Sequence, residues 1–571
     1  MENGIGAPRI EVPCIRNSFS MANSQHGSGV SMAHVNMMTD TIIANLPADG
    51  LRVVMRSLLV LFPEITRDFE CETKKYVEQK ATSSIAGKDK KACLPDLIKT
   101  QQIARSMLGC GLSNKSLQLF QNLVSQGTVL VSQIHDGSLD ELHAFLTSVD
   151  GDIVQAMTAV QKALLIDTGA RIMDNGEHSI VEALHQSLAS CYATLKGTNQ
   201  EFPFSRSLVA TAGILGLPRP ALSDAYQSLS EQNSVIPLPR QARETILING
   251  HKVPRIFSGL WQMSSPAWGA ASSSKIVEQF SRHVRQGFTA FDMADHYGDA
   301  EIVFGRFSSL YPHRDAIFTA TKYCVFHRMT VSREAVQANV TERCRRLQTD
   351  KISLLQFHWQ FYQIPEYLDA LRFLTEDGRV EAVGLCNFDT MHLLKVVEAG
   401  IKVYTNQVQF SLVDSRPVFR MGNACEKHNI KLLTYGTLCG GFLADKWLGK
   451  PEPDIYDGST TPSQRKYFEM IRSWGGWALF QELLAALRVI ATQHQVSISN
   501  VATRWVLDFS YVGAVIVGAR MGISDHTDEN LASFGWALDQ SDRDTIEGIL
   551  TRSRRSEIFQ NVGDCGAEYR T

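Results

Sequence analysis

The sequence contains no long uninterrupted apolar run, and its first residues lack a basic start followed by an apolar core. The first absence argues against a membrane-spanning helix, which needs about 20 apolar residues, and the second against a secretory signal. Positive charge is not in excess either, because 56 Lys and Arg face 59 Asp and Glu. Binding to nucleic acid or to an anionic membrane surface is therefore not expected. We expect a cytoplasmic protein that acts on small molecules.

Paired cysteine motifs are also missing. The 11 cysteines are odd in number and include no Cys-x-x-Cys pair, which argues against a disulfide framework and favours a reducing compartment. Because the Cys and His residues do not form compact clusters, no metal site is expected. No Gly-x-Gly-x-x-Gly follows a first strand, so a dinucleotide is not expected in a Rossmann domain.

The N-terminal half is predicted to be helical. A chain of 571 residues exceeds the usual size of a single core, so we expect at least two domains. Residues 1–45 lack periodicity and are predicted to be disordered. Residues 46–225 are predicted to form an all-helical domain of unknown role, because apolar residues recur at helical spacing. We interpret these stripes as core; they are Leu51, Val54, Met55, Leu58 and Phe62; Ile153, Ala156, Met157, Val160 and Leu164; and Val181, Leu184, Leu188, Cys191 and Leu195.

The C-terminal half has a different pattern. Prolines at 218, 220, 237 and 239 indicate a linker at 226–243. In residues 244–571, strand patterns then alternate with helix patterns, which predicts an α/β fold and, with eight strands, a (β/α)8 TIM barrel. The turn signal Asn249-Gly250 predicts a short hairpin that plugs the barrel floor. The eight predicted strands are 255–260, 290–292, 316–321, 352–357, 382–385, 404–408, 431–434 and 513–517.

Three segments carry the candidate chemistry: FDMADHYG, FTATKY and LLQFHWQ. They place Asp292, Tyr297, Lys322 and His358 at the ends of the second, third and fourth predicted strands or just beyond them, where barrel active sites are assembled. In this order the segments resemble the signatures of the aldo-keto reductases. The resemblance extends over about residues 244–548 and leaves the helical half unmatched. It implies an NADPH-dependent oxidoreductase that interconverts an aldehyde or ketone and an alcohol by direct hydride transfer, without a metal.

The resemblance also implies a role for each of the four residues. Tyr297 would be the general acid, and Lys322 would lower the pKa of its phenol. Asp292 would hold the Lys322 ammonium, and His358 would orient the substrate carbonyl. Taken singly, a Lys after a strand is usually solvated and a His in an apolar run is usually a core residue. The combination on three successive strand ends favours an active site.

The cofactor residues follow from the same resemblance. Asn387 and Gln407 would bind the nicotinamide carboxamide, and Tyr435 would stack on the nicotinamide ring. The segment after the eighth strand resembles the family's adenosine-phosphate clamp. Its candidate contacts are Gly518, Arg520, His526, Glu529 and Asn530.

Within that clamp, Arg520 is the main cation for a ribose 2′-phosphate, which favours NADPH over NADH. Two residues depart from the family pattern: Cys386 stands where Ser is usual, and His526 stands where many members have Arg. The first weakens a contact to the carboxamide, and the second makes the charge of the clamp depend on pH.

Substrate contacts are suggested by two tryptophans. Trp261 after the first predicted strand and Trp359 beside His358 would form an aromatic wall for an apolar or planar substrate, or else pack in the core. The insertion 440–477 is predicted to cover the barrel mouth. The sequence does not specify the substrate or the direction of reaction.

Two alternatives to an enzyme with a passive helical half stay open. The first is a non-catalytic, nicotinamide-binding redox sensor or regulatory subunit that acts through the helical domain. The second gives the helical half its own enzymatic or assembly role, through self-association or a protein partner. Turnover with a panel of carbonyl compounds separates the first alternative from a reductase.

Overall fold

The computed structural model of the protein describes residues 46–86, 93–133, 139–166, 169–196, 201–218, 220, 237–264, 271–454 and 460–570. The chain forms two compact units, residues 1–61 and 62–571. In the first unit, the described residues contain helix α2 (Ala48–Leu61). The predicted disordered segment 1–45 and residues 226–236 of the predicted linker lie outside the described residues, whereas 237–243 form neither helix nor strand.

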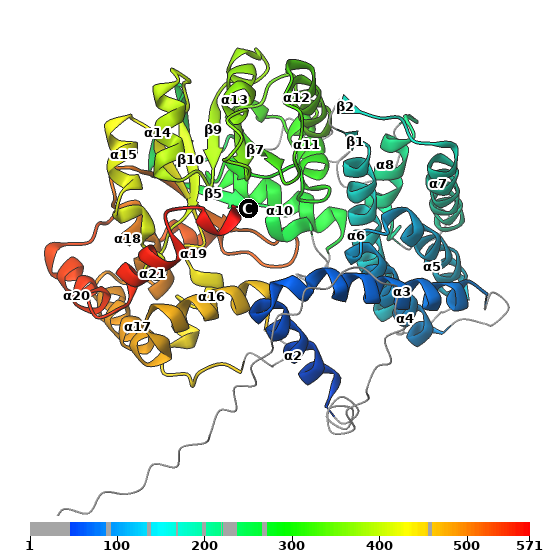
Figure 1. Ribbon diagram of the computed structural model, residues 1–571, viewed down its shortest axis with the longest axis horizontal. Coiled ribbons are helices and arrows are strands. Elements are labelled where there is room, and N and C mark those ends of the chain that lie inside the picture. The colour runs from blue at the N-terminus through cyan, green and yellow to red at the C-terminus, as the bar shows by residue number, and fades with distance from the viewer. Residues whose placement is uncertain are drawn as a thin grey trace, which may run out of the picture. The chain divides into compact units, whose positions relative to one another are not determined.

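The C-terminal half of the second unit is a closed barrel of eight parallel strands in the order β10-β11-β12-β5-β6-β7-β8-β9 (Figure 1). Each predicted strand is present, so the TIM-barrel prediction is confirmed. The strands are almost wholly buried because helices cover their outer faces and side chains fill the interior. Their bounds are β5 (Ile256–Gly259), β6 (Ala290–Asp292), β7 (Phe318–Val325), β8 (Leu354–Trp359), β9 (Val383–Cys386), β10 (Thr405–Gln409), β11 (Lys431–Tyr435) and β12 (Val512–Gly518).

Helices surround the strands and enclose the larger of the apolar clusters of the barrel. A second cluster fills the barrel interior and includes Ile248 and Val253, which come from the hairpin β3 (Thr245–Ile248) and β4 (His251–Pro254). Asn249 and Gly250 form its turn with φ values of 45° and 83°, as the Asn-Gly signal predicts. The helices are α10 (Ser273–Arg285), α11 (Ala300–Leu310), α12 (Arg333–Leu347), α13 (Tyr367–Glu376), α14 (Thr390–Glu398), α15 (Met421–Lys427), α16 (Pro462–Trp474), α17 (Gly476–Gln493), α18 (Ile498–Leu507), α19 (Thr527–Leu531), α20 (Gln540–Leu550) and α21 (Arg555–Val562).

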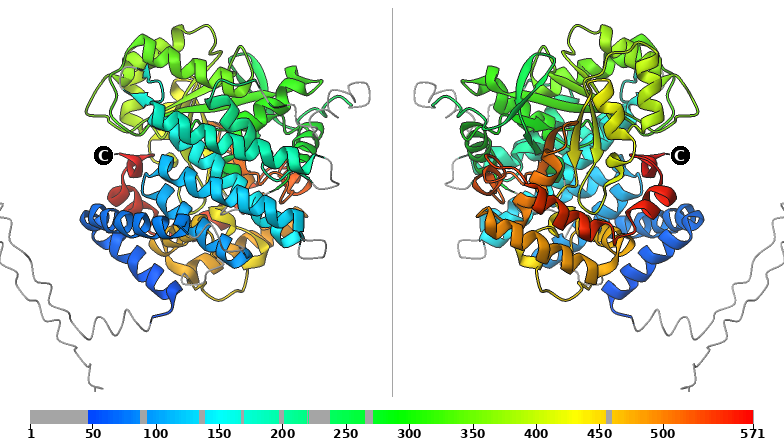
Figure 2. Two further views of the ribbon diagram at one scale, coloured as in Figure 1. Left: turned by 90° about the vertical axis from the view of Figure 1, so that its right-hand side faces the viewer. Right: turned by 90° about the vertical axis from the view of Figure 1, so that its left-hand side faces the viewer.

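The helical region before the barrel has an apolar core of its own. The second and third predicted stripes are buried in that core, except for Leu164, which is partly exposed, and Figure 2 shows the long helices of this region lying side by side. The first predicted stripe is not core, because Val54, Met55, Leu58 and Phe62 are 36–48% exposed. The region nevertheless belongs to the same compact unit as the barrel, and the domain boundaries at 225 and 244 stay predictions. Its elements are α3 (Thr66–Ala86), α4 (Leu94–Gly109), α5 (Ser113–Gln133), α6 (Leu139–Ala163), β1 (Leu165–Ile166), β2 (Gly169–Ala170), α7 (Asn175–Leu195) and α8 (Ser205–Ile214).

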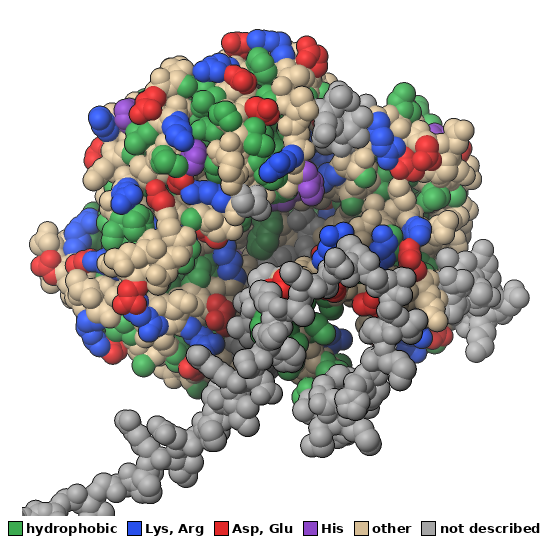
Figure 3. Space-filling view, viewed as in Figure 1, with side chains coloured by type: hydrophobic (Ala, Val, Ile, Leu, Met, Phe, Trp, Pro, Cys, Tyr) green, Lys and Arg blue, Asp and Glu red, His purple; other side chains and the backbone are tan. Residues whose placement is uncertain are grey.

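Charges of both signs are mixed on the face of the molecule drawn in Figure 3. Figure 3 shows Lys and Arg side chains interspersed with Asp and Glu over the face drawn, without a large area of one sign. In the part of the chain that the structure describes, no helix combines the length and the apolar character needed to cross a bilayer.

Candidate active site

Asp292 is the centre of a buried polar network at the carboxyl end of β6. Its Oδ2 lies 2.5 Å from Nζ of Lys322 on β7, and both side chains are at most 4% exposed. The Lys322 ammonium also donates to the carbonyl of Met293, at 2.9 Å. Burial works to lower the pKa of Lys322, but Asp292 and Tyr297 beside it outweigh burial and the pKa is raised. Lys322 is therefore a permanent buried cation.

The second oxygen of Asp292 is held by two amides. Gln356 of β8 and Gln407 of β10 each donate from Nε2 to Oδ1 at 2.8 Å, and Gln407 also donates to Oε1 of Gln356 at 2.8 Å. Residues of four strands thus fix the position of the carboxylate that holds Lys322. Gln407 is predicted from the sequence to bind the cofactor, whereas no role for Gln356 is predicted. Gln356 is two residues before His358 on one strand, so the two side chains point to the same side of the sheet. This spacing could have identified Gln356 from the sequence.

Tyr297 lies in the loop between β6 and α11, close to Lys322. The Lys322 ammonium is 5.0 Å from the centre of the Tyr297 ring, so the two groups are neighbours as expected. Lys322 lowers the pKa of Tyr297, as expected, but its charge is not the larger influence. Burial raises the pKa of Tyr297 by more than the charge of Lys322 lowers it. The phenol is therefore kept protonated at neutral pH.

His358 is buried beside these groups on β8 and is 5% exposed. Burial, with smaller contributions from His296 and Lys322, lowers the pKa of His358 to about 4, so the imidazole is neutral at pH 7. Its Nε2 has no hydrogen-bond partner among the described residues. An unpartnered buried nitrogen is destabilising by about 1–3 kcal/mol, and such a group is well suited to a ligand that can pair with it.

Two of the predicted nicotinamide contacts meet at the mouth of the barrel. Asn387 follows β9 with a φ of 56° and accepts a hydrogen bond from the Tyr435 hydroxyl at 3.0 Å. The same hydroxyl is 3.2 Å from that of Tyr569, near the end of the chain. The Tyr569 ring is in turn 5.6 Å from the His358 ring and nearly perpendicular to it. The C-terminal segment therefore contributes a wall to this site, which the sequence analysis does not predict.

The C-terminal segment is anchored by ion pairs. Arg416 binds Glu568 with two hydrogen bonds of 2.8 and 2.9 Å, and Arg570 lies 2.5 Å from Asp389. Gly566, at a φ of 74°, packs directly on the carbonyl of Asn387, so that any side chain at this position would collide with it. These contacts hold Tyr569 at the mouth. No sequence pattern marks them, because the partners are far apart along the chain.

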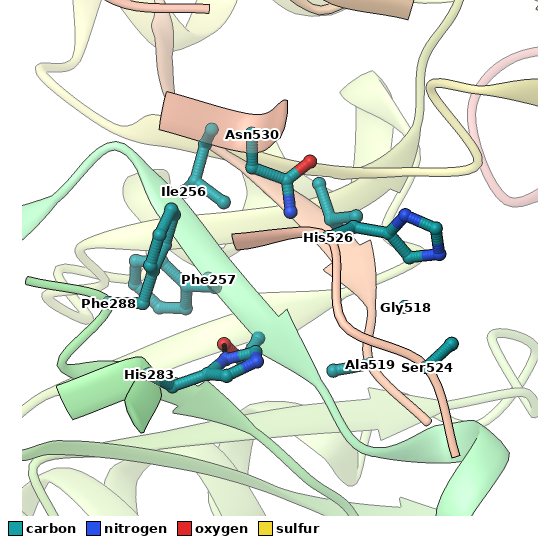
Figure 4. Close-up of a pocket in the computed structure, with 11 residues that line it drawn as sticks. Ile256, Phe257, His283, Phe288, Gly518, Ala519, Ser524, His526 and Asn530 are labelled. Atoms are coloured by element: carbon teal, nitrogen blue, oxygen red, sulfur yellow. Dashed lines mark hydrogen bonds between the residues drawn. The ribbon is translucent and has the colours of Figure 1, made fainter. Parts of the chain in front are cut away.

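The predicted adenosine-phosphate clamp is partly assembled around one pocket. Gly518 at the end of β12, His526 and Asn530 line this pocket together with the buried His283 of α10 (Figure 4). Arg520 and Glu529 are not among its lining residues. The Nδ1 of His526 lies 3.2 Å from a carboxylate oxygen of Glu529, so that these two predicted contacts also face each other.

The two tryptophans have different surroundings. Trp359 is 2% exposed and packs against Phe357, Phe361 and Tyr367. The prediction that Trp359 lines the substrate site is therefore corrected: its ring is a core group on the opposite side of β8 from His358. Trp261 lies in the short helix Trp261–Ser264 and is 46% exposed. A substrate contact for Trp261 stays a prediction.

One group of side chains beside the site has metal-ligand chemistry. Atoms of Asp295, His296 and Cys324 lie within 4.8 Å of one another. The carboxylate of Asp295, however, already faces Arg343 at 3.5 Å and accepts the backbone N–H of Cys324 at 3.1 Å. A guanidinium at this distance competes with a metal cation, and we assign no metal to this group.

Comparison with known proteins agrees with this geometry. The model of the Aldo/keto reductase family matches residues 255–551. The aldo-keto reductase YhdN of Bacillus subtilis is 26% identical over 54% of this chain and 92% of its own length. The chloroplastic pyridoxal reductase of Arabidopsis thaliana is 26% identical over 53% of this chain and 85% of its own.

Among solved structures, a glycerol dehydrogenase from Gluconobacter oxydans aligns with a TM-score of 0.44 and 24% identity, over 55% of this chain and 97% of that one. The family match spans more than half of the 571 residues. The chain belongs to the aldo/keto reductase family of oxidoreductases.

Proposed function

We propose that the barrel catalyses the NADPH-dependent interconversion of an aldehyde or ketone and an alcohol, with Tyr297 as general acid in reduction and general base in the reverse direction. The observation that carries the proposal is the convergence of four groups from three adjacent strands and the loop that follows the first of them. The Tyr297 phenol, the buried Lys322–Asp292 pair and the neutral His358 share one mouth.

Carbonyl reduction needs a proton on oxygen and a hydride on carbon. A bound nicotinamide cofactor supplies the hydride. The Tyr297 phenol, kept protonated by burial, donates its proton to the carbonyl oxygen, and the fixed charge of Lys322 stabilises the phenolate left behind. Asp292 holds the ammonium at 2.5 Å so that it does not turn away. His358, in the tautomer with its proton on Nε2, donates to the same carbonyl oxygen and polarises it.

The residues present fit such a cofactor. Gly518, His526 and Asn530 share a pocket, and Asn387 and Tyr435 meet at the mouth. These residues would hold the adenosine and nicotinamide ends of the dinucleotide.

The choice of NADPH rests on Arg520. Among the described residues its guanidinium makes no ion pair and is partly exposed, so its charge is available to a 2′-phosphate. Glu529 would contact the adenine. The small-molecule substrate would enter beside Trp261 and Tyr569.

The test uses the full-length protein. NADPH and then NADH are titrated by tryptophan fluorescence, and oxidation of the reduced cofactor is followed with a panel of aldehydes and ketones. Tyr297→Phe should lower turnover by about 100-fold or more, as expected for loss of a general acid, and should leave the Kd for NADPH within about twofold. A matched control is Tyr323→Phe, because the Tyr323 hydroxyl is also enclosed but points to the sulfur of Met329 at 3.2 Å.

Each outcome has a clear meaning. A fully active Tyr297→Phe enzyme would refute the proposed acid, and an equally inactive Tyr323→Phe enzyme would show that the loss is not specific. Tight NADPH binding by the wild-type protein without turnover of any carbonyl would favour the redox-sensor alternative. Failure to bind either nucleotide would refute the cofactor assignment.

A further inference from the structure

The loop that carries Tyr297, residues 293–299, is held in place by ionic side chains from outside the loop. On the barrel side, Arg346 of α12 donates from Nη2 to the carbonyl of Gly298 and from Nε to Glu301 at 2.8 Å. Arg343 of the same helix lies 3.5 Å from Asp295 and 3.1 Å from Glu301. The residues on both sides of Tyr297 are therefore tied to α12.

The helical region supplies further support. Arg206 of α8 forms two parallel hydrogen bonds with Asp299, from Nε at 2.6 Å and from Nη2. The two side chains are 12% and 4% exposed. Asp299 is the N-cap residue of α11, yet its carboxylate caps no backbone N–H, because Arg206 occupies both oxygens. A residue of the helical region thus fixes the point at which the Tyr297 loop enters α11.

A second contact joins the helical region to the same loop. Gln161 of α6 accepts a hydrogen bond from Nη1 of Arg346 at 3.0 Å, and Arg346 is the residue that holds the Gly298 carbonyl. Of the two residues that follow Tyr297, Asp299 is held directly by the helical region, and Gly298 is held by Arg346 of α12, to which Gln161 is hydrogen-bonded. Beyond the loop, α8 residues Val209 and Ala210 and the α11 residue Ile302 line one pocket between the two regions.

The position of Arg206 is fixed by hydrogen bonds between α8 and α6. The neighbouring Ser207 donates from its backbone N–H and from its hydroxyl to Oδ1 of Asp150 on α6, at 2.8 and 2.6 Å. Asp150 and Ser207 are both fully buried. These hydrogen bonds fix the start of α8 to α6. A displacement of either helix would move Arg206 and therefore Asp299.

We propose that the helical region is a positioning element for catalysis, in which Arg206 sets the position of the Tyr297 hydroxyl through Asp299. This inference rests on the proposed role of Tyr297 as general acid. A paired guanidinium and carboxylate fixes orientation as well as distance. A misplacement of about 1 Å in a reacting group lowers a rate by about 100-fold. Arg206 touches neither substrate nor cofactor in this scheme and acts through the loop.

The experiment compares variants of the full-length protein in kcat, KM and the Kd for NADPH. Arg206→Met and Asp299→Asn should each lower kcat by about tenfold to 100-fold, with the Kd for NADPH within about twofold. The double variant should be no worse than the worse single variant, since both changes break one contact. Arg206→Lys keeps the charge without the paired geometry and should recover only part of kcat.

Arg105→Met is the matched control. Arg105 pairs with the buried Asp152 at 2.9 Å inside the helical region, so its loss perturbs that region without breaking a contact with the loop. Its kcat should stay within about twofold of wild type when all proteins are assayed below their unfolding midpoints. A folded Arg206→Met protein with wild-type kcat, or an equal loss of kcat in Arg105→Met, would overturn the inference.

A second measurement separates this inference from the proposed function. Amide hydrogen exchange of residues 293–301 should accelerate at least tenfold in Arg206→Met and stay unchanged in Arg105→Met, whether or not a substrate is found. Unchanged exchange in Arg206→Met would refute the positioning role even in an active enzyme. If exchange accelerates in Arg206→Met but the Tyr297→Phe variant retains full activity, Arg206 does position the loop. The role of Tyr297 as general acid would then be refuted.

Discussion

Replacing Lys322 with Met should separate the stability of the site from its chemistry. The substitution leaves the Asp292 carboxylate, whose side chain is 4% exposed, without its counter-ion. Breaking a buried ion pair by removing one partner is destabilising by about 3–5 kcal/mol. Since Gln356 and Gln407 still donate to Oδ1, only Oδ2 loses its partner, and we expect the lower end, about 3 kcal/mol. For a cooperative unit of this size that is a fall of about 3 °C in the unfolding midpoint.

The assay is a thermal melt of the full-length protein, followed by turnover measurements at a temperature where every variant is folded. Lys322→Met/Asp292→Asn removes both charges and should regain most of the lost stability, to within about 1 kcal/mol of wild type. Neither variant should turn over a carbonyl substrate, because the phenolate of Tyr297 then has no cation beside it. The control is the exposed Lys427 of α15, whose replacement by Met should change stability by no more than about 0.5 kcal/mol.

Three results would refute this reasoning. A Lys322→Met protein as stable as wild type would mean that the pair contributes no net attraction. A double variant as unstable as the single one would mean that packing of the Lys322 stem, rather than the unpaired carboxylate, accounts for the loss. Full turnover by either variant would remove Lys322 from the mechanism.

Two further predictions concern the cofactor and pH. Arg520→Ala should weaken NADPH binding by about tenfold to 100-fold, the value of a charge-assisted hydrogen bond, and NADH binding by no more than about twofold; equal losses in the fluorescence titration would refute the 2′-phosphate contact. The pKa of folded His358 is lowered to about 4, so between pH 6.5 and pH 4 this residue takes up a proton in the unfolded chain but not in the folded one. The free energy of unfolding therefore decreases as the pH falls through that range. His358→Gln should accordingly lose about 2 kcal/mol less than wild type between pH 7 and pH 5, and a parallel loss in urea titrations at the two pH values would contradict the buried, neutral imidazole.

The barrel could be predicted from the sequence because each of its strands is a short apolar run between helix patterns. Burial on both faces leaves no alternation of polar residues to obscure such runs. The hairpin was equally accessible, since Asn249 and Gly250 accept the positive φ values that a two-residue turn needs. Asp292, Lys322 and His358 come together for the same reason: parallel strands end at one edge, so residues at their carboxyl ends become neighbours.

The errors have identifiable causes. Trp359 was placed in the mouth although it is adjacent to His358 on one strand, and adjacent strand residues face opposite sides. The net upward pKa shift of Tyr297 could not be predicted, because the sequence shows which charge is nearby but not how completely water is excluded. No sequence pattern indicates a role for Tyr569 or Arg206 in the site. Both reach the site through contacts between segments far apart along the chain, which only the folded structure reveals.

The contact between Arg206 and Asp299 also decides how the role of the helical region should be tested. Deleting that region would remove Arg206 and at the same time expose Asp299, whose carboxylate is 4% exposed in the whole chain. A solvated Asp299 would be free to turn back and cap α11, which is the usual role of Asp at a helix start. Tyr297 would then be held by a different set of contacts, and a loss of activity would not report on the ion pair alone. Point substitutions at Arg206 leave the interface in place, so a change in kcat reports on the ion pair itself.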